Sequence, residues 1–209
     1  MISAKQWNPS DFVGGRDCLD FANTVDWTGS PTPNDVLQEY RDLLGWCAAA
    51  GLIRSGQAKT LRRLARAEPE AATQVLRRAR ELRRALRGLF VSWADGESPR
   101  KADLDGLNDL LARAPARLSV RWRKGDYDWA RPEHRSLEML LWPVTWSAAD
   151  LLTHGDPVRL KRCADDGCSW FFYDASRNRS RRWCSMSTCG NRAKAQRHYQ
   201  RTKVTRTRV

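Results

Sequence analysis

The organisation of this 209-residue chain is decided by two cysteine pairs, Cys163-Ala-Asp-Asp-Gly-Cys168 and Cys184-Ser-Met-Ser-Thr-Cys189. Each pair has C-x4-C spacing, and fifteen residues separate one pair from the other. Thiolates are soft ligands that suit tetrahedral zinc, and two short chelating turns can bring four of them to one centre. The sequence therefore predicts one zinc ion bound by Cys163, Cys168, Cys184 and Cys189. Four protein ligands leave no open position for water, so we expect a structural zinc and not a catalytic one.

Basic charge gathers around these cysteines. Residues 159–209 contain fourteen Lys and Arg and three acids, a net charge of +11, whereas the other 158 residues hold 23 basic and 21 acidic groups, a net charge of +2. This asymmetry indicates a polyanionic partner for the C-terminal part. The chain has no apolar run of membrane-spanning length, and residues 1–30 lack the apolar core of a signal peptide. We therefore expect a cytoplasmic protein without membrane contact, in which clustered thiols stay reduced.

Two segments beside the cysteines have the composition of a nucleic-acid surface. The loop 176–182 mixes Arg with small hydroxyls, which suits phosphate contact, and residues 191–201 favour a helix that fits a major groove. On that helix Asn191, Arg192, Lys194 or Gln196 would read base edges. The predicted DNA-binding residues are Arg177, Asn178, Arg179, Arg181, Arg182, Asn191, Arg192, Lys194, Arg197 and Arg201.

The remaining residues of this region have structural interpretations. We expect the aromatic residues to form a small core around the zinc instead of stacking on bases, and these are Trp170, Phe171, Phe172 and Trp183. Asp174 is expected to anchor an Arg of the loop. Residues 202–209 have almost no apolar content, which predicts a tail that is disordered when free.

Apolar periodicity predicts a helical N-terminal domain. The expected helices run from Thr32 to Gly51, from Ser55, from Pro69 to Ala94, from Ser98 to before Pro115, and from Arg135 to His154 with a kink at Pro143. Residues 118–129 alternate in polarity around a turn at 124–126, which predicts a β-hairpin. The predicted fold class is therefore mainly α with a small β-hairpin (α+β), a helical domain over residues 1–156 followed by a zinc-finger module over 157–209.

Three further features of the N-terminal domain have open interpretations. The aromatic face of the hairpin either packs on the helices or forms one wall of a small-molecule pocket. Asp20, Asn23 and Thr24 are expected to cap helices and fix loops, in preference to binding a ligand. The helix from Pro69 carries a basic stripe that we expect to face solvent, made of Arg77, Arg78, Arg80, Arg83, Arg84 and Arg87.

The C-terminal motif resembles a known family. Cys189-Gly190-Asn191-Arg192, preceded by 180–186 and by Phe172-Tyr173-Asp174, is similar to the CGNR zinc finger. Residues 19–24 and 40–46 resemble the ABATE domain that commonly precedes that finger. The resemblance implies a bacterial, stress-related transcription regulator with a zinc-binding end that contacts DNA.

Three function classes remain at this point. The first is a regulator that binds double-stranded DNA and whose helical domain binds a small-molecule effector or forms a homodimer. The second is an RNA-binding zinc protein, because basic zinc modules also bind RNA. The third is an enzyme with its site in the N-terminal domain, which we disfavour because the sequence shows no nucleophile–base pair, open metal site or Gly-rich phosphate loop. We therefore expect a DNA-binding regulator that is not an enzyme.

Overall fold

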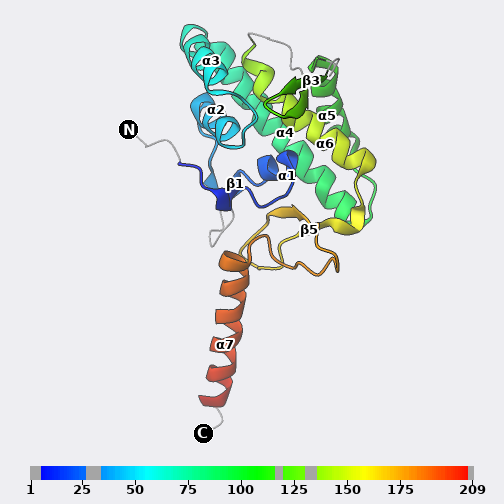
Figure 1. Cartoon of the computed structure of the whole chain (residues 1–209). Coiled ribbons are helices and arrows are strands. Elements are labelled where there is room, and N and C mark those ends of the chain that lie inside the picture. The colour runs from blue at the N-terminus through cyan, green and yellow to red at the C-terminus, as the bar shows by residue number, and fades with distance from the viewer. Residues whose placement is uncertain (1–5, 27–33, 116–119, 130–135, 207–209) are drawn as a thin grey trace.

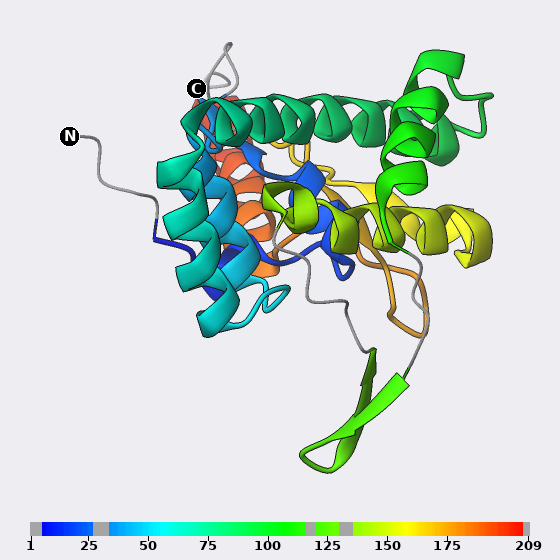
Figure 2. The same ribbon diagram turned by 90° about the horizontal axis from the view of Figure 1, so that it is seen from above.

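Helices form most of the protein in the computed structural model, which describes residues 6–26, 34–115, 120–129 and 136–206. The N-terminal part contains α1 (Asp17–Ala22), α2 (Tyr40–Ala49), α3 (Ser55–Ala67), α4 (Pro69–Asp95), α5 (Lys101–Arg113) and α6 (Trp142–His154). The long helix α4 crosses the whole N-terminal part, and α1, α2, α3 and α5 pack against it (Figures 1 and 2). The predicted class, helical with a small β-hairpin and a C-terminal cysteine module, is confirmed.

Local sequence sets the ends of α4 as predicted. Pro69 occupies the first turn, where its missing N–H costs no hydrogen bond. Gly96 ends the helix in the left-handed region, with a φ of 72° that a residue with a Cβ rarely adopts. The residues that α4 buries recur every three or four positions and include Ala72, Val75, Ala79, Leu82, Leu86, Leu89 and Phe90.

The helix predicted from Thr32 begins later, at Tyr40. Residues Asn34–Asp35 instead form β2, which pairs with β1 (Val25–Asp26), while Thr32 and Pro33 lie outside the described residues. The carboxylate of Asp42 accepts hydrogen bonds from the backbone N–H groups of Gln38 and Glu39 at 2.9 and 2.8 Å. These bonds satisfy donors that the first turn cannot pair, so the helix starts there.

The helix predicted from Arg135 to His154 is two elements. A 3-10 turn, η2 (Leu137–Leu140), precedes α6, and Arg135 lies outside the described residues. Pro143 sits in the first turn of α6, a position where proline fits, so it starts a new helix instead of kinking a long one.

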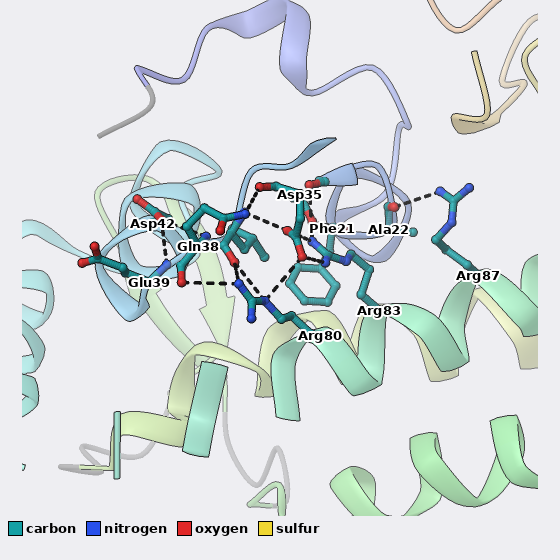
Figure 3. Close-up of polar contacts among 11 residues, drawn as sticks. Phe21, Ala22, Asp35, Gln38, Glu39, Asp42, Arg80, Arg83 and Arg87 are labelled. Carbon is teal, nitrogen blue, oxygen red and sulfur yellow. Dashed lines mark hydrogen bonds and ion pairs between the residues drawn. The ribbon is translucent and has the colours of Figure 1, made fainter. Parts of the chain in front are cut away.

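The basic stripe predicted on α4 does not face solvent as a whole. Arg83 is 4% exposed and binds both carboxylate oxygens of Asp35, at 2.8 and 2.5 Å, and the Thr24 hydroxyl at 3.0 Å. Arg80 donates to the Leu37 carbonyl, and Arg87 donates to the Ala22 carbonyl (Figure 3). The remaining arginines of the stripe are placed differently: Arg78 pairs with Glu138, and Arg77 and Arg84 are exposed. Arg80, Arg83 and Arg87 therefore hold residues 22–24 and 35–37 on α4, because their side chains are long enough to reach acceptors in these segments.

The predicted hairpin forms, but it packs differently from both expectations. β3 (Val120–Arg123) and β4 (Asp126–Trp129) pair antiparallel, with Trp122 opposite Tyr127. These two rings contact edge to face, with centroids 4.9 Å apart, and are 62% and 73% exposed. The hairpin projects from the helices (Figure 2), so this aromatic pair does not pack on them. Leu118 and Ser119 lie outside the described residues.

The cysteine module is docked on the N-terminal helices by a short sheet. β5 (Leu160–Arg162) pairs antiparallel with β6 (Phe171–Tyr173), and Leu160 and Phe171 are buried in the main hydrophobic core. The side chain of Asn23 donates to the Phe171 carbonyl and accepts from the Phe171 N–H, both at 2.8 Å. The Asn23 side chain therefore pairs with the backbone of β6 as a neighbouring strand would, and this contact connects α1 to the module. The expected role was to cap a helix or fix a loop, and the observed contact is instead with a strand.

Asp20 occupies the same junction. It is 8% exposed, and its carboxylate accepts the N–H of Gly14 at 2.7 Å. Burial, and to a smaller extent the charge of Asp17, raises the pKa of Asp20 to about 7, although the Gly14 N–H and the charge of Arg181 act in the opposite direction. The carboxyl group is thus protonated in the folded state over a pH range in which it ionises in the unfolded chain.

Among the described residues, no helix combines the length and the apolar character that crossing a bilayer requires.

The buried pair of Arg83 and Asp35 gives a first prediction. Arg83→Met removes the buried guanidinium that binds both carboxylate oxygens of Asp35 and leaves that carboxylate with only the longer Arg80 contact and the Leu37 N–H, so the free energy of unfolding should fall by about 3 kcal/mol. Arg84→Met changes the exposed neighbour on the same helix and should alter it by no more than about 0.5 kcal/mol. Urea unfolding followed by circular dichroism measures both. Equal losses in the two variants would contradict the buried role of Arg83.

A second prediction concerns pH. Because Asp20 keeps its proton in the folded state to about pH 7 and loses it near 3.8 when unfolded, its contribution to stability falls as pH rises between these values. Asp20→Asn retains the oxygen that accepts from Gly14 but cannot ionise. The variant should therefore gain stability relative to the wild type between pH 4 and pH 8, by on the order of 3 kcal/mol. A difference that stays constant across this range would show that Asp20 does not titrate in this way.

Candidate metal centre and nucleic-acid surface

Four cysteine sulfurs meet at one point in the C-terminal module. The Sγ atoms of Cys163, Cys168, Cys184 and Cys189 all lie within 4.8 Å of one another. The Sγ of Cys184 is 3.8 Å from that of Cys168 and 3.6 Å from that of Cys189. A tetrahedral site with Zn–S bonds of about 2.3 Å has sulfurs roughly 3.8 Å apart, so the cluster fits one zinc ion. The predicted ligand set is therefore brought together as expected, and the site is closed.

Backbone turns place these thiols. Cys163 follows β5, and its N–H donates to the Trp170 carbonyl at 2.9 Å, which extends the β5–β6 pairing to the metal site. The Cys168 N–H closes a turn onto Asp165 O at 2.8 Å. Cys189 lies in a π-helical turn, η4 (Met186–Gly190). A Cβ on Gly190 would lie 2.5 Å from the Met186 sulfur, so a larger residue there would displace the Met186 side chain.

A small core surrounds the cluster, largely as predicted. Phe172 is completely buried among the cysteines, and Trp170, Trp183 and Val13 pack around them. Phe171 differs from the prediction because it belongs to the main core and meets the ring of Phe90 at 5.8 Å between centroids. Adjacent residues of a strand point to opposite sides, so Phe171 and Phe172 serve two different cores.

Arg192 is part of the metal site and not of the exposed surface. Its Nε donates to Asp165 Oδ2 at 2.6 Å, and its Nη2 donates to the Cys189 Sγ at 3.3 Å. The Asp165 side chain is 1% exposed, so its carboxylate is shielded from water, whereas the Arg192 side chain is 33% exposed. Four thiolates on one zinc carry a formal charge of −2, which the guanidinium offsets. Arg192 therefore supports zinc binding, while its predicted role in DNA contact would require it to leave this position.

Arg181 also has a structural position. Its guanidinium donates to the carbonyls of Val13, Trp183 and Cys184 and lies 4.4 Å from the centroid of the Phe172 ring. These contacts join the N-terminal segment to the metal site. Sequence reasoning assigned Arg181 to phosphate contact because a basic loop does not reveal which of its members finds buried carbonyls.

Asp174 anchors the basic loop through its backbone. The carboxylate accepts the Lys161 ammonium at 2.8 Å, the Ser176 N–H at 3.0 Å and the Arg181 N–H at 2.9 Å. Burial raises the pKa of Asp174, but these donors outweigh it and hold the pKa below its usual value. The expected partner was an Arg side chain, and the observed charged partner is Lys161, which also donates to the carbonyls of Arg179 and Arg181. The sequence contained no signal for Lys161.

The other predicted DNA-binding residues lie on two exposed segments. In the loop, Arg177, Asn178 and Arg182 are exposed, while Arg179 pairs with Asp156 at 3.2 Å. On α7 (Asn191–Arg206), Asn191 donates to the Ser187 carbonyl, and Arg197 and Lys194 are exposed. The position of Arg201 falls within the helix, and its side chain lies outside the described residues.

Helix α7 projects away from the rest of the protein (Figure 1). It packs against η4, starts directly after it, and continues to Arg206, so the disorder predicted from residue 202 is wrong up to that residue; 207–209 lie outside the described residues. The helix has six Lys and Arg and no acid over sixteen residues, a length of about 24 Å. Most side chains of α7 that the structure describes, from Lys194 to Gln200, are exposed, and a polar helix of this kind is suited to a charged partner.

Comparison with known proteins gives two matches. A family model named ABATE, described as "Putative stress-induced transcription regulator", matches residues 15–155, which is more than half of the chain. A second model, the CGNR zinc finger, matches residues 159–202. Both agree with the resemblance expected from the sequence, and both describe regulatory or zinc-finger proteins and not enzymes. No curated protein matches the chain.

The contrast between Arg192 and Lys194 gives a third prediction. Arg192→Gln and Lys194→Gln each remove one positive charge from the first turn of α7, but only the first leaves a buried carboxylate unpaired. Arg192→Gln should release zinc to a chelator at least tenfold faster than the wild type, with a loss of stability of about 2 kcal/mol. A chromogenic chelator measures the release rate. Similar rates for the two variants would mean that the position of Arg192 beside Asp165 and Cys189 does not support the metal.

Proposed function

The chain belongs to the ABATE family and carries a CGNR zinc finger, and on that premise we propose that it is a transcription regulator that binds duplex DNA through its zinc-organised module. The observation that carries this proposal is the free-standing helix α7, which has a charge of +6 from Lys and Arg and no acid. A helix of this diameter fits the major groove, and its cations can replace the counterions of the phosphates. Zinc has a scaffold role in this proposal, and no reaction is assigned to the protein.

The exposed loop supports a second set of phosphate contacts. Arg177 and Arg182 lie on the same module as α7, and the backbone of the loop is fixed by Asp174 and Lys161. A fixed loop presents its cations without a large loss of conformational entropy on binding. We assign the loop and α7 to one DNA-binding unit over residues 157–209.

We infer a regulatory role for residues 1–156, as an effector-binding or dimerising unit. The support is the number of bonds that cross from this part to the module. Asn23 holds Phe171, the Tyr173 N–H donates to Gly14 O at 2.8 Å, and the Trp170 indole donates to Val25 O at 3.2 Å. A shift of α1 or its flanking segments would therefore move β6 and the metal site with them.

Binding to DNA gives a fourth prediction. Fluorescence anisotropy with a labelled duplex should show binding that weakens steeply with salt. Lys194→Gln combined with Arg197→Gln should lower the affinity at least tenfold at low salt and reduce the slope of log K against log salt by about 1.8, since each lost phosphate contact removes about 0.9.

The matched control is Arg62→Gln combined with Arg63→Gln, two exposed arginines on α3, which lies at the other end of the protein (Figure 1). This control should leave the slope unchanged. Competition with RNA of equal length tests the alternative partner: DNA-specific binding supports the proposal, and preference for RNA would replace it. The absence of duplex binding at low salt would refute the proposed function.

A further inference from the structure

A hollow of about 300 Å³ lies in the corner between the metal site and α7. One wall is the turn after Cys163, with Asp166, and the segment Arg182–Trp183. The other wall is a single face of α7. Its residues are Ala193, Gln196, Arg197 and Gln200.

The spacing of these four α7 residues defines the face. Positions three, four and seven residues apart lie on one side of a helix, so Ala193, Gln196, Arg197 and Gln200 form a continuous stripe over two turns. Ala193 is half-buried and has a short side chain, and the three longer residues are exposed. Lys194 is turned by about 100° from Ala193 and so points away from this stripe.

We propose, resting on the function proposed above, that α7 reads duplex DNA with the face turned toward this corner. Gln196 and Gln200 bind adenine edges in the major groove, and Arg182 and Arg197 hold the phosphate strand that passes through the corner. A duplex placed against this face meets two walls, the helix and the metal module, whereas a duplex against any other face of α7 meets the helix alone. The corner therefore fixes the register of the helix on the DNA.

The side chains match these roles. A glutamine amide has one donor and one acceptor side by side, which pair with N7 and N6 of adenine. Arg182 lies 5.2 Å from the centroid of the Trp183 ring, which supports its guanidinium while leaving it exposed. No carboxylate among the described residues pairs with Arg182 or Arg197, so both charges are available for phosphates.

Two residues expected to read bases are occupied elsewhere. The amide of Asn191 donates to Ser187 O at 3.0 Å, and Arg192 is bound to Asp165 and the Cys189 sulfur. The residues proposed to contact bases therefore lie in the second and third turns of α7, at Gln196 and Gln200, and not in its first turn.

The acids of the corner also have separate roles. Asp165 is neutralised by Arg192, whereas Asp166 is exposed on the wall opposite the helix. An unpaired carboxylate there repels phosphate and leaves the strand on the side of Arg182 and Arg197. Asp166→Asn should therefore tighten binding to every duplex, by about threefold at low salt.

The test uses the full, zinc-loaded chain and selection of bound sequences from a randomised duplex pool. The wild type should select a sequence that contains adenines at fixed positions. Gln196→Ala and Gln200→Ala should each lose the preference at one position, a fall in discrimination of roughly 10- to 100-fold, with the other positions retained. Lys194→Ala is the matched control on the same helix, and it should select the wild-type sequence with weaker affinity.

The outcomes separate this inference from the proposed function. If the glutamine variants select the wild-type sequence with unchanged discrimination, the reading face is wrong although the protein binds DNA. A wild type that binds duplexes without any preference overturns the base-reading role in the same way. If the wild type binds no duplex, both the function and the inference fail. Zinc content and the helical circular-dichroism signal confirm that each variant is folded.

A comparison of two arginine variants tests the phosphate contact in the corner. Arg182→Gln should weaken binding to all sequences alike, by about five- to tenfold at low salt, and leave the selected sequence unchanged. Arg177→Gln removes an exposed arginine of the same loop that does not line the corner. Its effect should be smaller, and a loss as large as that of Arg182→Gln would overturn the path of the strand through the corner.

Discussion

The C-terminal quarter of the structure depends on one constraint, that four thiolates from two distant turns must meet at a single centre. The β5–β6 pairing delivers Cys163 and Cys168, and η4 delivers Cys189 beside Cys184. The core around them is small, with Phe172 as its only completely buried aromatic ring among the described residues, so most of its stability must come from the metal. Because α7 starts directly after Cys189 and Gly190, the same ion sets the direction of the basic helix.

The cysteine module also packs against the helical part and is hydrogen-bonded to it. Phe171 and Phe172 are neighbours in sequence, yet one completes the main core and the other completes the metal-site core. Asn23 and Arg181 add polar bonds across the same junction. These contacts join the finger to the helices through packed and hydrogen-bonded groups, and the proposed regulatory coupling would use them.

Much of this structure follows from local sequence. The cysteine spacing predicted the ligand set, and the three-to-four residue period predicted α4 to within one residue at its C-terminal end. The α4 arginines were misinterpreted because a helical pattern shows which face is charged and does not show that Ala22, Asp35 and Leu37 supply acceptors to that face. The structural contacts of Arg181 and Arg192 could not be predicted for the same reason, since their acceptors come from Val13 and Asp165, 168 and 27 residues away in the sequence. The start of α2 was missed because the side chain of Asp42 decides it.

The central claim is that zinc positions a basic helix for binding to duplex DNA. The most direct measurement is the duplex affinity of one preparation before chelation of zinc, after chelation, and after zinc is returned under reducing conditions. The account predicts tight, salt-sensitive binding in the first state, loss of at least tenfold in the second, and recovery in the third with one zinc per chain. Equal affinity in the zinc-bound and zinc-free states would contradict it, because the basic charge alone would then suffice for binding.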